Sequence, residues 1–249
     1  MLQSDEPSPV QVTLEEARSP FVIVCDHAGR QLPIALGTLG LSAADLQAHI
    51  AWDIGAAGVA RRLSLELDAP LFEQRYSRLV IDCNRPLTAP DSIPKESGGT
   101  LIPGNERLSI AEANERARAI FMPYHARIRS ALAARKQPFV LIALHSFTPE
   151  LLGVVRPFHA GVLYDRDSRL AKPLLALLRA EVGLVVGENQ PYRASATTDY
   201  SIIEHAEARG APYVELEVRQ DLIADEPGQT AWAARLARLL REASESILS

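Results

Sequence analysis

The stretch PFVLIALHS, residues 138–146, decides the fold class. Its run from 138 to 144 is apolar throughout, which is typical of a strand that is covered on both faces. Strands of that kind belong to mostly parallel sheets that carry helices on both sides. Because His145 follows the run directly, this strand also brings a polar side chain to its carboxyl end.

Shorter apolar runs and helical patterns extend this sheet in both directions along the chain. Further strands are predicted at 21–25, 69–76, 78–83, 160–164, 183–187 and 212–218. Helices are predicted at 41–50, 53–67, 109–134, 167–182, 198–210 and 230–247, with a kink or break at Pro123. The alternation predicts a single three-layer α/β/α domain over residues 1–249, with a mostly parallel mixed sheet. Residues 1–18 are expected to be a surface or poorly ordered segment.

Composition excludes several classes of function. The chain has 249 residues, of which 47% are hydrophobic and 23% charged, and a net charge of -5. No basic run is present, so we expect no nucleic-acid surface, and no apolar run approaches the roughly 20 residues of a membrane span. Cys25 and Cys83 lie in apolar runs, which favours a reducing compartment over a disulfide. Since the N-terminus has no secretory pattern, a cytoplasmic location is expected.

Polar residues follow several of the predicted strands. In open α/β sheets, ligands bind outside the carboxyl ends of the strands. Asp26 and His27 follow one apolar run, Asn84 and Arg85 follow another, and His145 follows a third. Polar residues also follow two other strands, at 165–167 and 219–221. The pattern predicts one convergent polar site at this edge of the sheet.

His27 and His145 could form part of a zinc site, because catalytic zinc takes three protein ligands and keeps one open position. The third ligand would be a carboxylate, and Asp53 is preferred over its nearer rival Asp26, with His49 a weaker alternative. Asp53 could equally be a helix N-cap, and a single histidine is more often structural. The remaining histidines are expected not to be ligands: His125, His159, which precedes its strand, and His205.

A late strand offers a general base. Glu217 would face the metal-bound water and pass its proton to a leaving amine. An alternative is that Glu217 pairs with a neighbouring arginine. Glu215 lies on the same face of the strand by period-two alternation, so it is either a structural carboxylate or the base itself.

Two arginines are candidates for substrate binding. Arg85 could bind a carboxylate with both guanidinium prongs, or could form an internal ion pair with Asp82. Arg78 is a second candidate, or it extends to the sheet edge with its apolar stem buried. Two polar loops could also reach the site: 98–109 as a lid, and 187–201 through Tyr192, Arg193 and Asp199. No glycine-rich phosphate fingerprint is found.

Taken in order, these motifs resemble the N-formylglutamate amidohydrolase family, and the likeness runs roughly from residue 20 to residue 240. The segments that carry it are VCDHAG, HIAWDIGA, YSRLVIDCNRP, PGNERLS, LHSFTP, GVLYDRD, GENQPY and VELEVRQDL. The resemblance implies a hydrolase fold like that of the zinc carboxypeptidases and aspartoacylases, which is also related to the phosphorylases.

The resemblance also implies roles for individual residues. His27 and His145 would bind one zinc ion together with an acid, Glu217 would be the base, and Asn84 with Arg85 would hold a substrate carboxylate. Carboxypeptidases place the acid three residues after the first histidine. That position is Arg30 here, so Asp53 is expected to take its place.

The expected function is therefore metal-dependent hydrolysis of the amide bond of an N-formyl or N-acyl amino acid such as N-formylglutamate. One alternative is a deacylase or peptidase that acts on another substrate with the same fold. Another is a protein that binds a metal or small molecule without turnover. The partner is expected to be a small molecule, and no oligomeric state is predicted.

Overall fold

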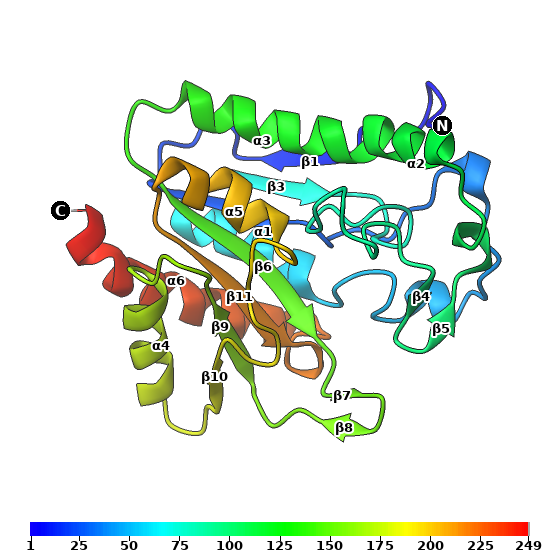
Figure 1. Ribbon diagram of the computed structural model, residues 1–249. Coiled ribbons are helices and arrows are strands. Elements are labelled where there is room, and N and C mark those ends of the chain that lie inside the picture. The colour runs from blue at the N-terminus through cyan, green and yellow to red at the C-terminus, as the bar shows by residue number, and fades with distance from the viewer. Residues whose placement is uncertain (249) are drawn as a thin grey trace.

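A mixed seven-stranded sheet forms the centre of the computed structural model, which describes residues 1–248 (Figure 1). Its strands lie in the order β1-β3-β2-β6-β11-β9-β10. Their bounds are β1 Val10–Thr13, β2 Phe21–Cys25, β3 Leu71–Gln74, β6 Val140–Phe147, β9 Ala160–Leu163, β10 Val186–Glu188 and β11 Tyr213–Arg219. Two small hairpins lie outside this sheet, namely β4 Glu96–Ser97 with β5 Thr100–Leu101, and β7 Glu150–Leu151 with β8 Val154–Val155.

The four central strands run in one direction. β3, β2, β6 and β11 are parallel to their neighbours, whereas β1 is antiparallel to β3 and β9 is antiparallel to β11. β10 is parallel to β9, so these last two strands both run against the centre. The predicted mostly parallel mixed sheet is confirmed, with reversed strands at each side.

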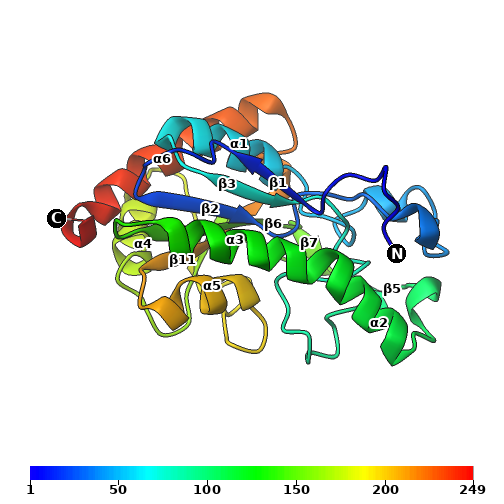
Figure 2. The ribbon, with the colours of Figure 1, turned by 90° about the horizontal axis from the view of Figure 1, so that it is seen from above.

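Helices cover both faces of the sheet, as Figure 2 shows from above. The helices are α1 Ala56–Leu67, α2 Ile110–Arg116, α3 Met122–Ala134, α4 Ala171–Ala180, α5 Tyr200–His205 and α6 Glu226–Leu248. α1, α4 and α6 pack with Ile23 in one buried cluster, and α3 and α5 pack with Val22 and Val24 in the other. Alternate residues of β2 thus enter opposite layers, which explains why its sequence is apolar throughout.

The prediction of a strand at 78–83 is wrong. Residues 79–85 form turns without a strand partner, although Leu79 and Val80 are fully buried. Side chains satisfy the backbone carbonyls in place of a neighbouring strand: Asn105 donates to Leu79 over 2.8 Å and Arg116 donates to Val80 over 2.9 Å. An apolar run indicates that a segment is buried but not that it is a strand. Here the buried segment is a loop that packs beneath α2 and α3.

Three further elements differ from expectation. The helix predicted at 41–50 is reduced to a single 3-10 turn at Asp45–Gln47. The N-terminal segment 1–18 contributes β1, which pairs with β3. The helix predicted at 109–134 contains a π-helical turn at Ala117–Phe121, directly before Pro123. A wider turn there accommodates the missing proline N–H without breaking the helix.

Short 3-10 turns complete the chain at Ile34–Leu36, Pro103–Asn105, Glu207–Arg209 and Gln220–Leu222. Cys25 and Cys83 are both buried and free. Across residues 1–248, none of the helices is long and apolar enough to cross a membrane.

Candidate active site

The site lies where β2, β6 and β11 approach one edge of the sheet. His27 follows β2 by two residues, and His145 lies near the end of β6. The parallel register of β6 and β11 pairs His145 with Glu217. Asp53 comes from the segment before α1, and its backbone N–H donates to the carbonyl of His27 over 3.0 Å. The fold therefore brings His27, Asp53, His145 and Glu217 together, as their sequence positions predicted.

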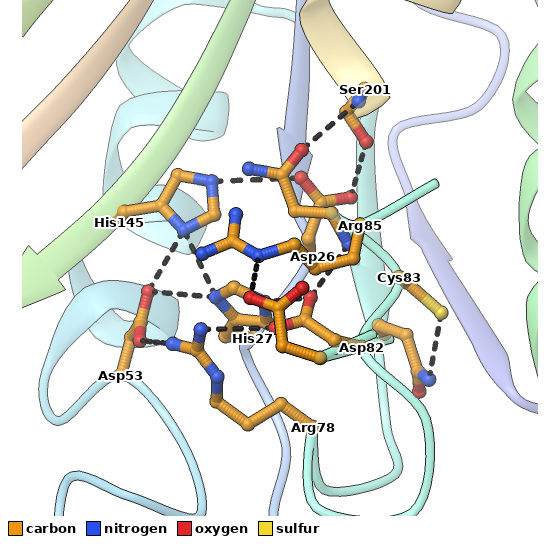
Figure 3. Close-up of polar contacts among 12 residues, drawn as sticks. Asp26, His27, Asp53, Arg78, Asp82, Cys83, Arg85, His145 and Ser201 are labelled. Carbon is orange, nitrogen blue, oxygen red and sulfur yellow. Dashed lines mark hydrogen bonds and ion pairs between the residues drawn. The ribbon is translucent and has the colours of Figure 1, made fainter. Parts of the chain in front are cut away.

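Three of these residues point their ligand-type atoms at one another (Figure 3). Nδ1 of His27 lies 3.2 Å from Nδ1 of His145. Oδ2 of Asp53 lies 3.4 Å from the first nitrogen and 2.9 Å from the second. Zinc ligands about 2.1 Å from a tetrahedral ion are roughly 3.4 Å apart. The spacing of the three atoms, each from a residue no more than 3% exposed, therefore suits one divalent ion.

The other nitrogen of each imidazole faces a carboxylate. Nε2 of His27 is 2.7 Å from Oδ1 of Asp82, and Nε2 of His145 is 3.5 Å from Oδ2 of Asp26. Ser201 donates its hydroxyl to Oδ1 of Asp26 over 2.7 Å. Histidines that bind metals commonly donate their second N–H to a carboxylate, which fixes the ring. Asp26 thus contacts the far side of the His145 ring. Asp53, in contrast, faces the point where the two Nδ1 atoms meet.

Arg78 joins two of these carboxylates. Its guanidinium donates to Oδ1 of Asp53 over 3.3 Å and to Oδ2 of Asp82 over 3.0 Å. Because Asp82 also holds His27, one cation orients both a ligand-type carboxylate and the partner of a ligand-type histidine. The same side chain lines the cavity described below.

The charges in this cluster shift its pKa values strongly. Burial alone would raise the pKa of Asp26, but its close contact and ion pair with His145 outweigh burial and lower the pKa to about 2. In the same way, burial acts against the ionised form of Asp53, while the charge of His27 and the contact with His145 hold its pKa below the usual range. Both aspartates are therefore anions at neutral pH and available to cations.

The two glutamates of β11 shift the other way. Burial raises the pKa of Glu217 to about 7, and the nearby His145 offsets only part of that effect. Burial, followed by the charge of Asp199, raises the pKa of Glu215 well above its usual value. A carboxyl group that titrates near neutrality is suited to accepting and returning a proton.

A cavity of about 320 Å³ opens beside these groups. Its walls consist of His27, Asp53, Arg78, Asn84, Arg85, His145, Ser146, Tyr192, Arg193, Thr198, Asp199, Glu215 and Glu217. Every residue preferred from the sequence for catalysis, substrate binding or metal binding is in this wall, whereas the alternative ligands Asp26 and His49 are not. The two polar loops also contribute differently: the 187–201 loop lines the cavity, whereas no residue of 98–109 does.

Asn84 and Arg85 enter the cavity from the buried 79–85 segment. The side-chain oxygen of Asn84 accepts from the backbone of Ser201 over 3.0 Å, which leaves the amide NH₂ directed toward Glu215 at 3.5 Å. Arg85 donates to Asp91 over 2.9 Å and to the carbonyl of Thr198. Its acidic partner is therefore Asp91, and not Asp82 as in the alternative interpretation of the sequence.

Some polar residues do not reach the site. Residues 165–167 lie at the opposite edge, because β9 runs antiparallel to β11. The same reversal places His159 at the site's edge of the sheet, contrary to the expectation, but its Nδ1 accepts from the backbone of Val185. His125 and His205 pair with each other over 2.9 Å.

Sequence reasoning assigned no role to Ser201 and only a possible ion pair to Asp82. Asp82 could have been found, since an acid inside an apolar run requires a buried partner. Ser201 gives no comparable signal.

Comparisons with known proteins identify several similar proteins. A family model described as N-formylglutamate amidohydrolase matches residues 19–224. Gene product Atu2144 from Agrobacterium tumefaciens has a solved structure with 40% sequence identity and a TM-score of 0.96, covering 100% of this chain and 99% of that one. N-formylglutamate amidohydrolase from Ralstonia eutropha JMP134 is 22% identical with a TM-score of 0.70, covering 96% and 98%.

More distantly, a bacteriophage poly-gamma-glutamate hydrolase shares the fold at 11% identity, with a TM-score of 0.51 and coverage of 98% of this chain and 92% of that one. No curated protein matches the chain.

Proposed function

Because this chain belongs to the N-formylglutamate amidohydrolase family and is an amidohydrolase, we propose that it hydrolyses an N-formyl or N-acyl amino acid, N-formylglutamate above all, with a metal-activated water. The observation that carries the proposal is the convergence of His27, Asp53 and His145 in one cavity with Glu217. The reaction adds water to the acyl carbon, breaks its bond to nitrogen, and releases formate or another small acid and a free amino acid.

The metal would be held by Nδ1 of His27, Nδ1 of His145 and a carboxylate oxygen of Asp53. The donor set of two imidazoles and one carboxylate is typical of catalytic zinc. When bound, a zinc ion supplies Lewis-acid activation of a water molecule and of the scissile carbonyl. Asp82 and Asp26 would hold the two rings in the tautomers that keep both Nδ1 atoms free of protons.

Glu217 would act as the general base. It lies opposite His145 across the β6–β11 pair, and its Oε2 is buried without a hydrogen-bond partner among residues 1–248. An unpaired carboxylate oxygen can accept a proton from the attacking water and then deliver it to the leaving nitrogen. The raised pKa of Glu217 favours both steps near neutral pH.

Asn84 and Arg85 would bind a carboxylate of the substrate, with Arg78 adding positive charge beside them. The amide NH₂ of Asn84 faces the cavity, and within residues 1–248 one terminal nitrogen of Arg85 makes no hydrogen bond. Fixing the substrate carboxylate places the scissile amide at a set distance from Glu217, which restricts turnover to amino acids with a short acyl group.

Formate release from N-formylglutamate tests the proposal, with a panel of other N-acyl amino acids and dipeptides beside it. We expect turnover that a chelator abolishes and zinc restores. Glu217→Gln should lower kcat by about a thousandfold while zinc remains bound, whereas Asp53→Asn should lose zinc. Glu245→Gln, at an exposed position of α6, is the control for a lost glutamate.

Full turnover by metal-loaded Glu217→Gln would refute the assignment of the base. Chelator-resistant turnover by the wild-type chain would refute the metal-dependent mechanism. Efficient hydrolysis of dipeptides with no release of formate would favour the peptidase alternative.

A further inference from the structure

The cavity walls contain three arginines with different contacts. Arg78 is committed to two carboxylates, Asp53 and Asp82. Arg85 is engaged on two of its nitrogens, by Asp91 and by the carbonyl of Thr198. The third, Arg193, lines the same cavity, and its side chain has no hydrogen bond or ion pair within residues 1–248. Of the three arginines, Arg193 is therefore the one with its whole guanidinium available to a ligand.

The loop that carries Arg193 is seated directly on the sheet. A Cβ added to Gly161 would lie 2.1 Å from the carbonyl oxygen of Gln190, and one added to Gly187 would lie 2.6 Å from the Gln190 side chain. Only glycine at both positions lets the loop approach so closely. Because Gly161 is the β-sheet partner of Glu217, the loop is fixed beside the general base.

A second contact holds Tyr192, two residues after Gln190 in the same loop. Arg156 donates to the hydroxyl of Tyr192 over 2.7 Å, and its guanidinium lies 4.8 Å from the centre of the Tyr192 ring. This pairing fixes the residue that precedes Arg193. Arg193 therefore extends from an anchored loop.

The remaining charges of the cavity make this cation important for an acidic substrate. The carboxylates of Asp53 and Asp199 line the walls, so a ligand with two carboxylates meets repulsion unless each of its carboxylates has its own cation. Asn84 and Arg85 can serve one carboxylate only. Resting on the proposed function, we propose that Arg193 binds the side-chain carboxylate of the substrate and thereby selects N-acyl derivatives of acidic amino acids.

The test compares N-formylglutamate with N-formylglutamine, which has nearly the same shape without the second charge. Binding is measured by calorimetry in the zinc-loaded Glu217→Gln chain, where turnover does not interfere, and kinetics are measured in the otherwise wild-type chain. Arg193→Gln should weaken N-formylglutamate binding by about tenfold and leave N-formylglutamine within about twofold. In kinetics the loss should fall on KM, with kcat retained.

Two further variants isolate the role of the charge. Arg193→Lys should keep part of the preference for N-formylglutamate. Arg118→Gln removes an exposed arginine on the helical segment that precedes α3 and should change neither ligand.

Equal losses for the two ligands in Arg193→Gln would overturn the assignment, as would a wild-type chain that binds both equally or does not bind N-formylglutamate. Failure of the proposed function has a different signature: the charge preference and its dependence on Arg193 would persist in binding, while the wild-type chain released no formate.

Discussion

At the residue scale, each buried histidine of the site is paired with buried carboxylates. Each imidazole that faces Asp53 has a second carboxylate behind it, Asp82 for His27 and Asp26 for His145. The acids keep the rings oriented, and Ser201 keeps Asp26 oriented. The convergence of His27 and His145 was predictable, because both residues follow apolar runs. Ser201 was not, because it approaches from a helix more than 50 residues away from His145 in the sequence.

A second pair of histidines lies outside the site. His125 must donate its Nε2–H to the carbonyl of Cys83, 2.9 Å away, so its Nδ1 accepts a hydrogen bond from the Nε2–H of His205. That leaves Nδ1 of His205 buried without a partner among residues 1–248. Burial lowers the pKa of His125 to about 4, and burial with the charge of His125 lowers that of His205 to about 3.

This pair predicts a loss of stability in mild acid. A histidine of the unfolded chain takes up a proton as the pH falls below about 6.5, whereas the folded pair stays neutral until about pH 4. Stability is therefore complete above that unfolded-state pKa and declines as the pH falls. Between about pH 7 and about pH 5, His125 alone should remove about 2 kcal/mol from the free energy of unfolding.

Urea denaturation at the two pH values measures this effect. His125→Gln, whose amide can still donate to Cys83, should reduce the pH dependence by that amount. An unchanged difference between the two pH values in His125→Gln would contradict the prediction.

At the element scale, the buried 79–85 segment carries three of the polar side chains of the site without being a strand. Its hydrophobicity resembles that of β2, but β3 already has β2 on one side and β1 on the other, so no sheet edge remains there. Sequence patterns could predict the burial and the polar tip of this segment. They could not predict its backbone, because hydrogen bonds from distant side chains decide it.

Asn105 is the main residue that holds this segment. Its amide donates to the carbonyls of Leu79 and Pro94 over 2.8 and 2.7 Å, and its oxygen accepts from Arg116 over 2.7 Å. Asn105→Ala removes all three hydrogen bonds and leaves the buried carbonyl of Leu79 without a donor, so we expect about 3 kcal/mol less stability in urea denaturation.

The same variant should also lower activity, because Asp82 and Asn84 are carried by this segment. Glu106→Ala, at the exposed neighbouring position, is the matched control. Wild-type stability in Asn105→Ala would show that another contact fixes the segment.

At the scale of the whole molecule, the layers and the mostly parallel sheet were predictable from alternating apolar runs and helices. The reversed direction of β9 and β10 was not, because a short apolar strand reads alike in either direction. This reversal removes residues 165–167 from the site. It also explains why the 187–201 loop must turn back across the sheet to reach the cavity.

Five buried acidic side chains lie close together in the site: Asp26, Asp53, Asp82, Glu215 and Glu217. Arg78 pairs with two of these acids, so a divalent cation should relieve much of the remaining repulsion. Zinc at about a hundredfold its Kd should raise the free energy of unfolding by about 2.7 kcal/mol.

Thermal unfolding with zinc, and again after chelation, measures this stabilisation. Asp53→Asn should abolish the response and Asp5→Asn, near the N-terminus, should keep it. An equal response in Asp53→Asn would mean that zinc stabilises the chain from another site.

The central place of β11 governs the order in which the chain can assemble during synthesis. This strand begins at residue 213, yet it lies between β6 and β9. A nascent chain on the ribosome can pair β1, β3, β2 and β6 early, but β9 and β10 have no sheet to join until β11 emerges. The edge of β6 stays open while residues 148–212 are synthesised, and an open edge is where chains pair wrongly. The segment from residue 213 onward thus completes both the sheet and, through Glu217, the wall of the cavity.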